Sequence, residues 1–138
     1  MYGPRQLLTV HHAGVPGEEV SKRVLIVEDE QDVADLVADV LDLEGFEAQV
    51  ATSGETALDD ALTFHPDVVL LDLMMPGVDG FEVARRLQAH PDTHSLPIVV
   101  MTAMHDAQLR AQEVGTGLFL AKPFDIGDLI QTVERSTI

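Results

Sequence analysis

The chain has 138 residues, 46% of them hydrophobic, so its length and composition suit one domain with a sizeable core. Its formal net charge is -16, with only 8 Lys and Arg, which argues against direct nucleic-acid binding, because clustered cations grip phosphate backbones. The chain has no cysteine, no apolar run near the ~20 residues of a membrane span, and no signal-peptide pattern. We therefore expect no disulfide, no thiolate metal site and no membrane partner, and we expect a cytoplasmic location.

Residues 1–21 differ from the rest of the chain because they show no hydrophobic periodicity. Their turn-forming residues are Pro4, Gly14, Pro16 and Gly17. We expect a flexible N-terminal extension here, followed by a single domain over residues 22–138. His11 and His12 lie in this extension, and two adjacent histidines without further ligands are more often tail residues than a metal site.

From Arg23 onward, apolar runs of strand length alternate with helical patterns. The predicted strands are Arg23–Val27, Phe46–Ala51, Val68–Leu71, Ile98–Met101 and Gly117–Ala121. The predicted helices are centred on Val33–Leu41, Ala57–Leu62, Phe81–Leu87 and Ile126–Val133, with a further helix between Thr102 and Gly115. This alternation predicts an α/β fold, a doubly wound five-stranded parallel sheet with helices on both faces.

The helices carry recognisable packing and end signals. An apolar stripe of the first helix is expected to face the core, and Gly45 is expected to end this helix. The members of the stripe are Val33, Leu36, Val37, Val40 and Leu41. Thr52 and Glu55 have the spacing of a capping box, which predicts the start of the second helix.

Asp72 is the first candidate functional residue. Four apolar residues precede it and Pro76-Gly77 follows it, so its carboxylate is expected at the carboxyl edge of the sheet, where open α/β sheets bind ligands. A lone Asp at a strand end is more often a loop cap. The first strand, however, leads into Glu28, Asp29 and Glu30 at the same edge.

These carboxylates repel one another unless a cation joins them. A small set of hard oxygen ligands suits Mg²⁺, with Mn²⁺ as the alternative. We therefore predict a metal site at Glu28, Asp29 and Asp72. Glu30 is assigned instead to the N-terminus of the following helix, where its charge favours the helix dipole.

Two further strands end in polar residues. The fourth leads into Thr102, a hydroxyl donor, and the fifth into Lys122, an ammonium group. Four strand ends thus offer a carboxylate nucleophile, an acidic pair, a hydroxyl and a lysine. Such a set suits a phosphoryl group, because cations and donors neutralise and position its oxygens. Each residue alone says little, and the prediction rests on all of them in order.

Together these motifs resemble the receiver domain of two-component response regulators, over about Lys22–Val133. The matching motifs are the apolar strand into Glu28-Asp29-Glu30, then Leu71–Gly80, Met101-Thr102-Ala103 and Lys122-Pro123-Phe124. The resemblance implies a flavodoxin-like strand order of 2-1-3-4-5. It implies a phosphoacceptor signalling domain rather than an enzyme acting on other substrates. A sensor histidine kinase or a phosphotransfer protein is the implied donor, and the phosphorylation state switches binding of an output partner.

The resemblance also assigns roles to single residues. Asp72 accepts the phosphoryl group. Mg²⁺ is held directly or through water by Glu28, Asp29, Asp72 and the Met74 carbonyl. Thr102 and Lys122 bind the phosphoryl oxygens, and Phe119 is the aromatic rotamer switch, with static core packing of its ring as the alternative. A cis peptide bond joins Lys122 to Pro123, and a homodimer is left open.

Other classes of protein fit less well. A phosphatase of the haloacid dehalogenase type needs a second Asp two residues after the nucleophile, where this chain has Met74. A flavodoxin-like flavin protein needs a Ser-, Thr- or Gly-rich phosphate loop after its first strand, where this chain has Glu28–Asp32. A degenerate receiver is excluded because every matching position is filled.

Three features go beyond the family pattern. The segment from Thr102 to Gly115 is about two residues shorter than is usual in receivers, so a trimmed helix or loop is expected. Met74 and Met104 flank the site, and neither thioether is a good general base, which predicts slow loss of the phosphoryl group unless a partner assists. The alternative is that both methionines only fill the rim of the site. The chain stops at Ile138, so no output domain is expected. The alternative is a receiver fragment of a larger response regulator with a DNA-binding or enzymatic output domain.

Overall fold

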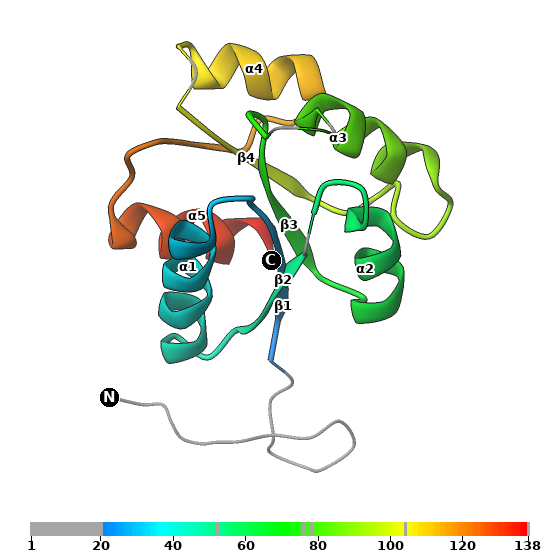
Figure 1. The fold of residues 1–138 in the computed structure, drawn as a ribbon. Coiled ribbons are helices and arrows are strands. Elements are labelled where there is room, and N and C mark those ends of the chain that lie inside the picture. Colours follow the sequence, from blue (N-terminus) through cyan, green and yellow to red (C-terminus); the bar gives the residue numbers. More distant parts are fainter. Residues whose placement is uncertain (1–20, 52, 76, 78, 104, 138) are drawn as a thin grey trace.

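A computed structural model of the chain describes residues 21–51, 53–75, 77, 79–103 and 105–137. Five strands and five helices alternate along these residues (Figure 1). The strands are β1 (Arg23–Val27), β2 (Glu47–Ala51), β3 (Val68–Asp72), β4 (Ile98–Thr102) and β5 (Phe119–Ala121). The helices are α1 (Gln31–Leu43), α2 (Ala57–Phe64), α3 (Gly80–Ala89), α4 (Ala107–Val114) and α5 (Ile126–Ser136). Within the described ranges, every helix is too short or too polar to cross a membrane.

The strands form one parallel sheet in the order β2-β1-β3-β4-β5. This confirms the predicted fold class and strand order. The chain leaves β1 toward one edge of the sheet and returns to β3 on the other side of β1, which makes this the topological switch point where such sheets bind ligands. The register aligns the carboxyl ends of the strands: Val27 lies opposite Leu71, Asp72 opposite Met101, and Thr102 opposite Ala121.

Helices cover both faces of the sheet. Figure 1 shows α1 and α5 on one face and α2, α3 and α4 on the other. Strand side chains alternate between the two cores, because successive residues of a strand point to opposite faces. Val24 and Ile26 of β1 pack with α1 and α5, whereas Leu25 and Val27 pack with the other three helices. β3 and β4 are buried throughout, as central parallel strands are.

Arg23 holds the amino end of the sheet together. Its backbone N–H donates to Asp67 Oδ2 at 2.8 Å, and its Nε donates to Glu47 Oε1 of β2 at 3.3 Å. Its Nη1 donates to the carbonyl oxygen of Phe64, the last residue of α2, at 2.6 Å, and the guanidinium carbon lies 5.3 Å from the centre of the Phe64 ring. One side chain therefore joins β1 to β2 and to α2.

Four of the five predicted stripe residues of α1 pack into the core: Val37 and Leu41 are buried, and Val33 and Val40 are partly buried. Ala34, Val37 and Leu41 are buried at the spacing i, i+3, i+7, whereas Leu36 is 59% exposed. The inclusion of Leu36 was wrong because the apolar pattern ranks a large leucine above a small alanine. The structure instead turns the Ala34 side of the helix toward the sheet.

Two helix ends test the predicted signals. Gly45 follows α1 in the left-handed conformation, with φ of 92°, and its N–H bonds back into the helix, which confirms its role as a terminator. The capping box at Thr52 is wrong, since α2 begins only at Ala57, and Thr52 itself lies outside the described residues. The turn before α2 is held by Ser53 and Thr56, whose hydroxyl oxygens each accept the other's backbone N–H, at 3.2 and 3.3 Å.

β5 is shorter than predicted, covering Phe119–Ala121 rather than Gly117–Ala121. The physical reason is that the Thr116 side chain competes for the backbone hydrogen bonds at the start of β5. The Thr116 hydroxyl donates to the Ile98 carbonyl oxygen at 2.8 Å and accepts the Leu118 N–H at 3.1 Å. The Thr116 hydroxyl therefore lies between the Leu118 N–H and the Ile98 carbonyl oxygen, whereas the Leu118 carbonyl oxygen still accepts the Val100 N–H at 3.0 Å.

Candidate functional site

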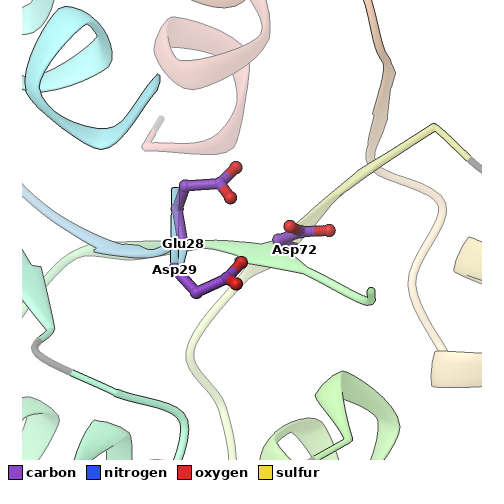
Figure 2. A group of neighbouring side chains, drawn as sticks. All are labelled: Glu28, Asp29 and Asp72. Carbon is purple, nitrogen blue, oxygen red and sulfur yellow. The ribbon is translucent and has the colours of Figure 1, made fainter. Parts of the chain in front are cut away.

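Three carboxylates gather at the carboxyl edge of the sheet. Glu28 and Asp29 directly follow β1, and Asp72 ends β3, the neighbouring strand (Figure 2). One oxygen from each carboxylate lies within 4.8 Å of the other two. Glu28 and Asp72 are buried, at 4% and 3% exposure, while Asp29 is exposed. The arrangement is an all-oxygen donor set, open to solvent on one side, that can hold a divalent cation.

Lys122 joins this group from the far side of the sheet. It directly follows β5, and its Nζ lies 2.5 Å from Glu28 Oε1 and 3.3 Å from Asp72 Oδ2. Its backbone N–H donates to the Thr102 carbonyl oxygen at 2.8 Å, and the peptide bond to Pro123 is cis, as expected. The ammonium group therefore bridges two buried carboxylates that come from different strand ends.

Burial and neighbouring charges shift the pKa values of both Glu28 and Lys122. Burial raises the pKa of Glu28, the Asp72 carboxylate adds to this, and the Lys122 ammonium opposes it. Burial works against the charged form of Lys122, but the Glu28 and Asp72 carboxylates outweigh it and raise the pKa of that ammonium group. Among the described residues, the cluster thus sets one ammonium group against three carboxylates.

The backbone after Asp72 also contacts its carboxylate. Asp72 Oδ1 accepts the Met74 N–H at 2.9 Å, which fixes one carboxylate oxygen and leaves Oδ2 toward Lys122. The Met74 side chain is 58% exposed beside the site. Met104, the other predicted flanking methionine, lies outside the described residues.

Thr102, Glu30 and Phe119 occupy three different positions relative to this group. Thr102 ends β4 next to Asp72 and is fully buried. Glu30 is the N-cap residue of α1, with its carboxylate 4.0 Å from Lys122 Nζ, and lies outside the cluster of three carboxylates. Phe119 begins β5 opposite Val100 and is 37% exposed, so its ring is not part of the buried core. The structure therefore brings together Glu28, Asp29, Asp72 and Lys122, with Thr102 beside them and Phe119 farther back along β5.

Gly80 was not among the predicted site residues. A Cβ atom at this position would lie 2.5 Å from the Asp72 carbonyl oxygen and 2.5 Å from Leu73 Cα, so only glycine fits. Asp79 precedes it and caps α3, its Oδ1 accepting the Phe81 N–H at 2.8 Å. The available signal was the Asp-Gly pair a few residues after Pro76-Gly77. Gly80 lets α3 start directly against the backbone of the acidic strand end.

This fold and this arrangement of strand ends agree with the comparison to known families. The family described as the response regulator receiver domain matches residues 24–134. The chain therefore belongs to the response regulator receiver domain family of two-component systems.

Relatives with known names support the same assignment. The response regulator PleD of Caulobacter vibrioides is 42% identical over 108 residues, which cover 77% of this chain and 24% of PleD. The transcriptional regulator RpaA of Synechocystis is 35% identical over 113 residues, covering 80% of this chain and 47% of RpaA. The chain thus spans about a quarter to a half of the length of these relatives. Among solved structures, chemotaxis protein CheY4 of Vibrio cholerae is 28% identical with a TM-score of 0.78, over 85% of this chain and 99% of CheY4.

Proposed function

We propose that this receiver domain is a phosphoacceptor module in which Asp72 takes a phosphoryl group from a phosphohistidine of a sensor kinase or a phosphotransfer protein. The phosphorylated and unphosphorylated forms then bind an output partner differently. The observation that carries the proposal is the position of Lys122 Nζ between Glu28 and Asp72, beside the three-carboxylate cluster. The domain catalyses only its own phosphorylation and dephosphorylation.

The donor set supports Mg²⁺ as the cofactor. Glu28, Asp29 and Asp72 supply closely spaced carboxylate oxygens, and two of these carboxylates are buried beside a single ammonium group, Lys122, among the residues that the structure describes. These residues, with the Met74 carbonyl oxygen, would hold the ion, and Mn²⁺ suits the same ligands. When bound, the cation supplies positive charge against the developing charge on the phosphoryl oxygens.

The chain's own residues position the reaction. One Asp72 carboxylate oxygen forms a bond to phosphorus while the phosphorus–nitrogen bond of the donor histidine breaks, and the electron pair of that bond returns to the imidazole. The Met74 N–H keeps the carboxylate oriented, and Lys122 is already within reach of the same side chain. Lys122 and the Thr102 hydroxyl would then bind phosphoryl oxygens, which stabilises the charge that the transfer creates.

The readout we propose runs through Thr102 and Phe119. Movement of the Thr102 side chain toward a phosphoryl oxygen opens space between β4 and β5, and the Phe119 ring can turn inward to fill it. The 37% exposure of Phe119 supports this, because an outward ring has apolar surface to gain by turning. We place the readout on α4, β5 and α5.

Mass spectrometry after treatment with a small acyl phosphate tests the function. The wild-type chain should gain one phosphoryl group in Mg²⁺ and none in a chelator, and Asp72→Asn should gain none. Asp79→Asn, which keeps a capping side chain on α3, is the matched control and should be phosphorylated normally. The proposal would be contradicted if Asp72→Asn were phosphorylated, or if the wild type were phosphorylated to the same extent with and without the chelator.

A second proposal is that the domain works as the receiver part of a larger regulator. The relatives support it, since PleD and RpaA are two to four times longer than the segments matched here. Sequencing the reading frame beyond Ile138 distinguishes the receiver part of a larger regulator from a stand-alone receiver. A linker followed by another domain favours the larger regulator, and an immediate stop favours a stand-alone or relay receiver.

A further inference from the structure

α4 is well held at its C-terminal end. Gly115 follows it in the left-handed conformation, with φ of 94°, and its N–H bonds to the carbonyl oxygens of Ala111 and Gln112. From the neighbouring helix α3, the Gln88 side chain donates through Nε2 to the Val114 carbonyl oxygen at 2.8 Å. The last carbonyl groups of a helix have no partner within the helix, so Gln88 satisfies one of them from outside.

The N-terminal end of α4 is held much less well. Its N-cap residue, Asp106, is left-handed, with φ of 60° and ψ of 55°, and makes no capping hydrogen bond through its side chain. One turn later, the buried Nε of Arg110 has no hydrogen-bond partner among the residues that the structure describes. The buried face of the helix consists of Ala107, Ala111 and Val114, which bury little apolar surface. A strained end on a small buried face is an end that can move.

α3 links α4 to the acidic strand end. At its first residue, Gly80, it touches the backbone of Asp72 and Leu73. Val83, Ala84 and Leu87 fix it to the sheet, and Gln88 lies directly after this buried face. Figure 1 shows α3 and α4 side by side, and the Gln88 hydrogen bond joins them there. A backbone shift at Asp72 therefore has a direct route to the C-terminal end of α4.

We propose that Gln88 is a positioning residue that couples α4 to the Asp72 site through α3. Its hydrogen bond keeps the C-terminal end of α4 in place as a pivot, and the uncapped N-terminal end is the part that moves. The hydrogen bond by which Gln88 keeps α4 in place does not depend on the proposed function. Its part in signalling, in contrast, rests on the proposed phosphorylation of Asp72.

Hydrogen exchange tests the hold on α4. Gln88→Leu keeps the size of the side chain but has no donor, so the amides of Gly115 and Thr116 should exchange about fivefold faster, the value of a typical single hydrogen bond. Gln88→Lys restores a donor and should exchange nearly as the wild type does. Gln108→Leu changes an exposed glutamine of α4 itself and should change nothing. Unchanged exchange in Gln88→Leu, or faster exchange throughout the protein, would overturn the proposal.

Amide chemical shifts with beryllofluoride and Mg²⁺, a phosphoryl mimic, test the coupling. In the wild type, shifts are expected near Asp72 and along residues 107–115. Gln88→Leu should keep the shifts near Asp72 and lose at least half of those along α4, whereas Gln88→Lys should recover them. Full α4 shifts in Gln88→Leu would contradict the coupling. An absence of shifts near Asp72 in the wild type would count against the proposed function instead, and the exchange experiment would still decide whether Gln88 holds α4.

Discussion

The charge of Asp72 lies close to two other carboxylates. Three carboxylates lie within 4.8 Å of one another, and the Lys122 ammonium bridges two of them. The charge on Asp72 contributes to the raised pKa of Glu28, which means that the two repel in the folded state. The residues to which we assign phosphoryl chemistry in the proposed function therefore cost stability when no cation or partner offsets their charge.

Replacement of Asp72 by Asn should stabilise the metal-free protein. The amide oxygen can still accept the Met74 N–H, Lys122 keeps Glu28 as its partner, and one repelling charge is removed. We expect the free energy of unfolding in urea with a chelator to rise by about 1 kcal/mol. Asp79→Asn removes an exposed charge elsewhere and should change it by less than about 0.5 kcal/mol. A loss of stability in Asp72→Asn would contradict this account of the site.

Gly80 is expected to tolerate no side chain. A Cβ atom there would meet backbone atoms of Asp72 and Leu73, which cannot rotate away, so Gly80→Ala should lower the free energy of unfolding by about 2 kcal/mol or more. Gly117→Ala is the matched control, because no atom lies within 4 Å of its added Cβ. Equal stabilities of the two variants would show that α3 does not start against the strand end as described.

At the level of elements, the strand ends were predictable and several contacts between elements were not. The runs before Glu28 and Asp72 are apolar without interruption, so the pattern located both carboxylates on one sheet edge. Lys122 and Glu28 are 94 residues apart, and no local pattern predicts their ion pair. The outward turn of Leu36 and the need for glycine at residue 80 depend on how closely a helix approaches the sheet, which hydrophobic periodicity alone does not contain.

α3 carries a charge cluster with a testable pH response. Glu82 accepts hydrogen bonds from Arg85 and, one residue later, from Arg86, and these lower its pKa to about 2. A lowered folded-state pKa means that this cluster stabilises the protein above the ordinary Glu value and that this contribution is lost as the pH falls through about 2.

Carboxyl NMR titration should therefore give a midpoint for Glu82 near 2. In the double variant Arg85→Ala, Arg86→Ala the midpoint should return toward the ordinary glutamate value of 4.5. Arg110→Ala, which breaks the ion pair to Glu113 on α4, is the control and should leave the Glu82 midpoint unchanged. A wild-type midpoint near 4.5 would refute the bonded geometry on α3.

At the level of the whole molecule, the net charge of -16 disfavours compactness at low salt. Salt screens this repulsion over about 10 Å at 0.1 M, so the melting temperature should rise with NaCl. MgCl₂ at the same ionic strength should raise it further, because binding to the folded state adds about 1.4 kcal/mol at tenfold excess over the dissociation constant.

Asp29→Asn should remove most of this extra stabilisation by Mg²⁺, since Asp29 is the exposed member of the carboxylate cluster. Asp39→Asn, which changes another exposed aspartate, on α1, should retain it. If Mg²⁺ and Na⁺ act alike on the wild type at equal ionic strength, the cluster does not bind the cation.

The contacts of Arg23 have a consequence for how the sheet opens. Within five residues, β1 passes from an end bonded to Glu47, Phe64 and Asp67 to an end that runs into mutually repelling carboxylates. We expect local opening to need more free energy at the amino end of the sheet than at its carboxyl end. The amino end can keep the strands in register while the residues around Asp72 rearrange. A signal can therefore change the structure at the carboxyl end of the sheet without breaking the contacts at its amino end.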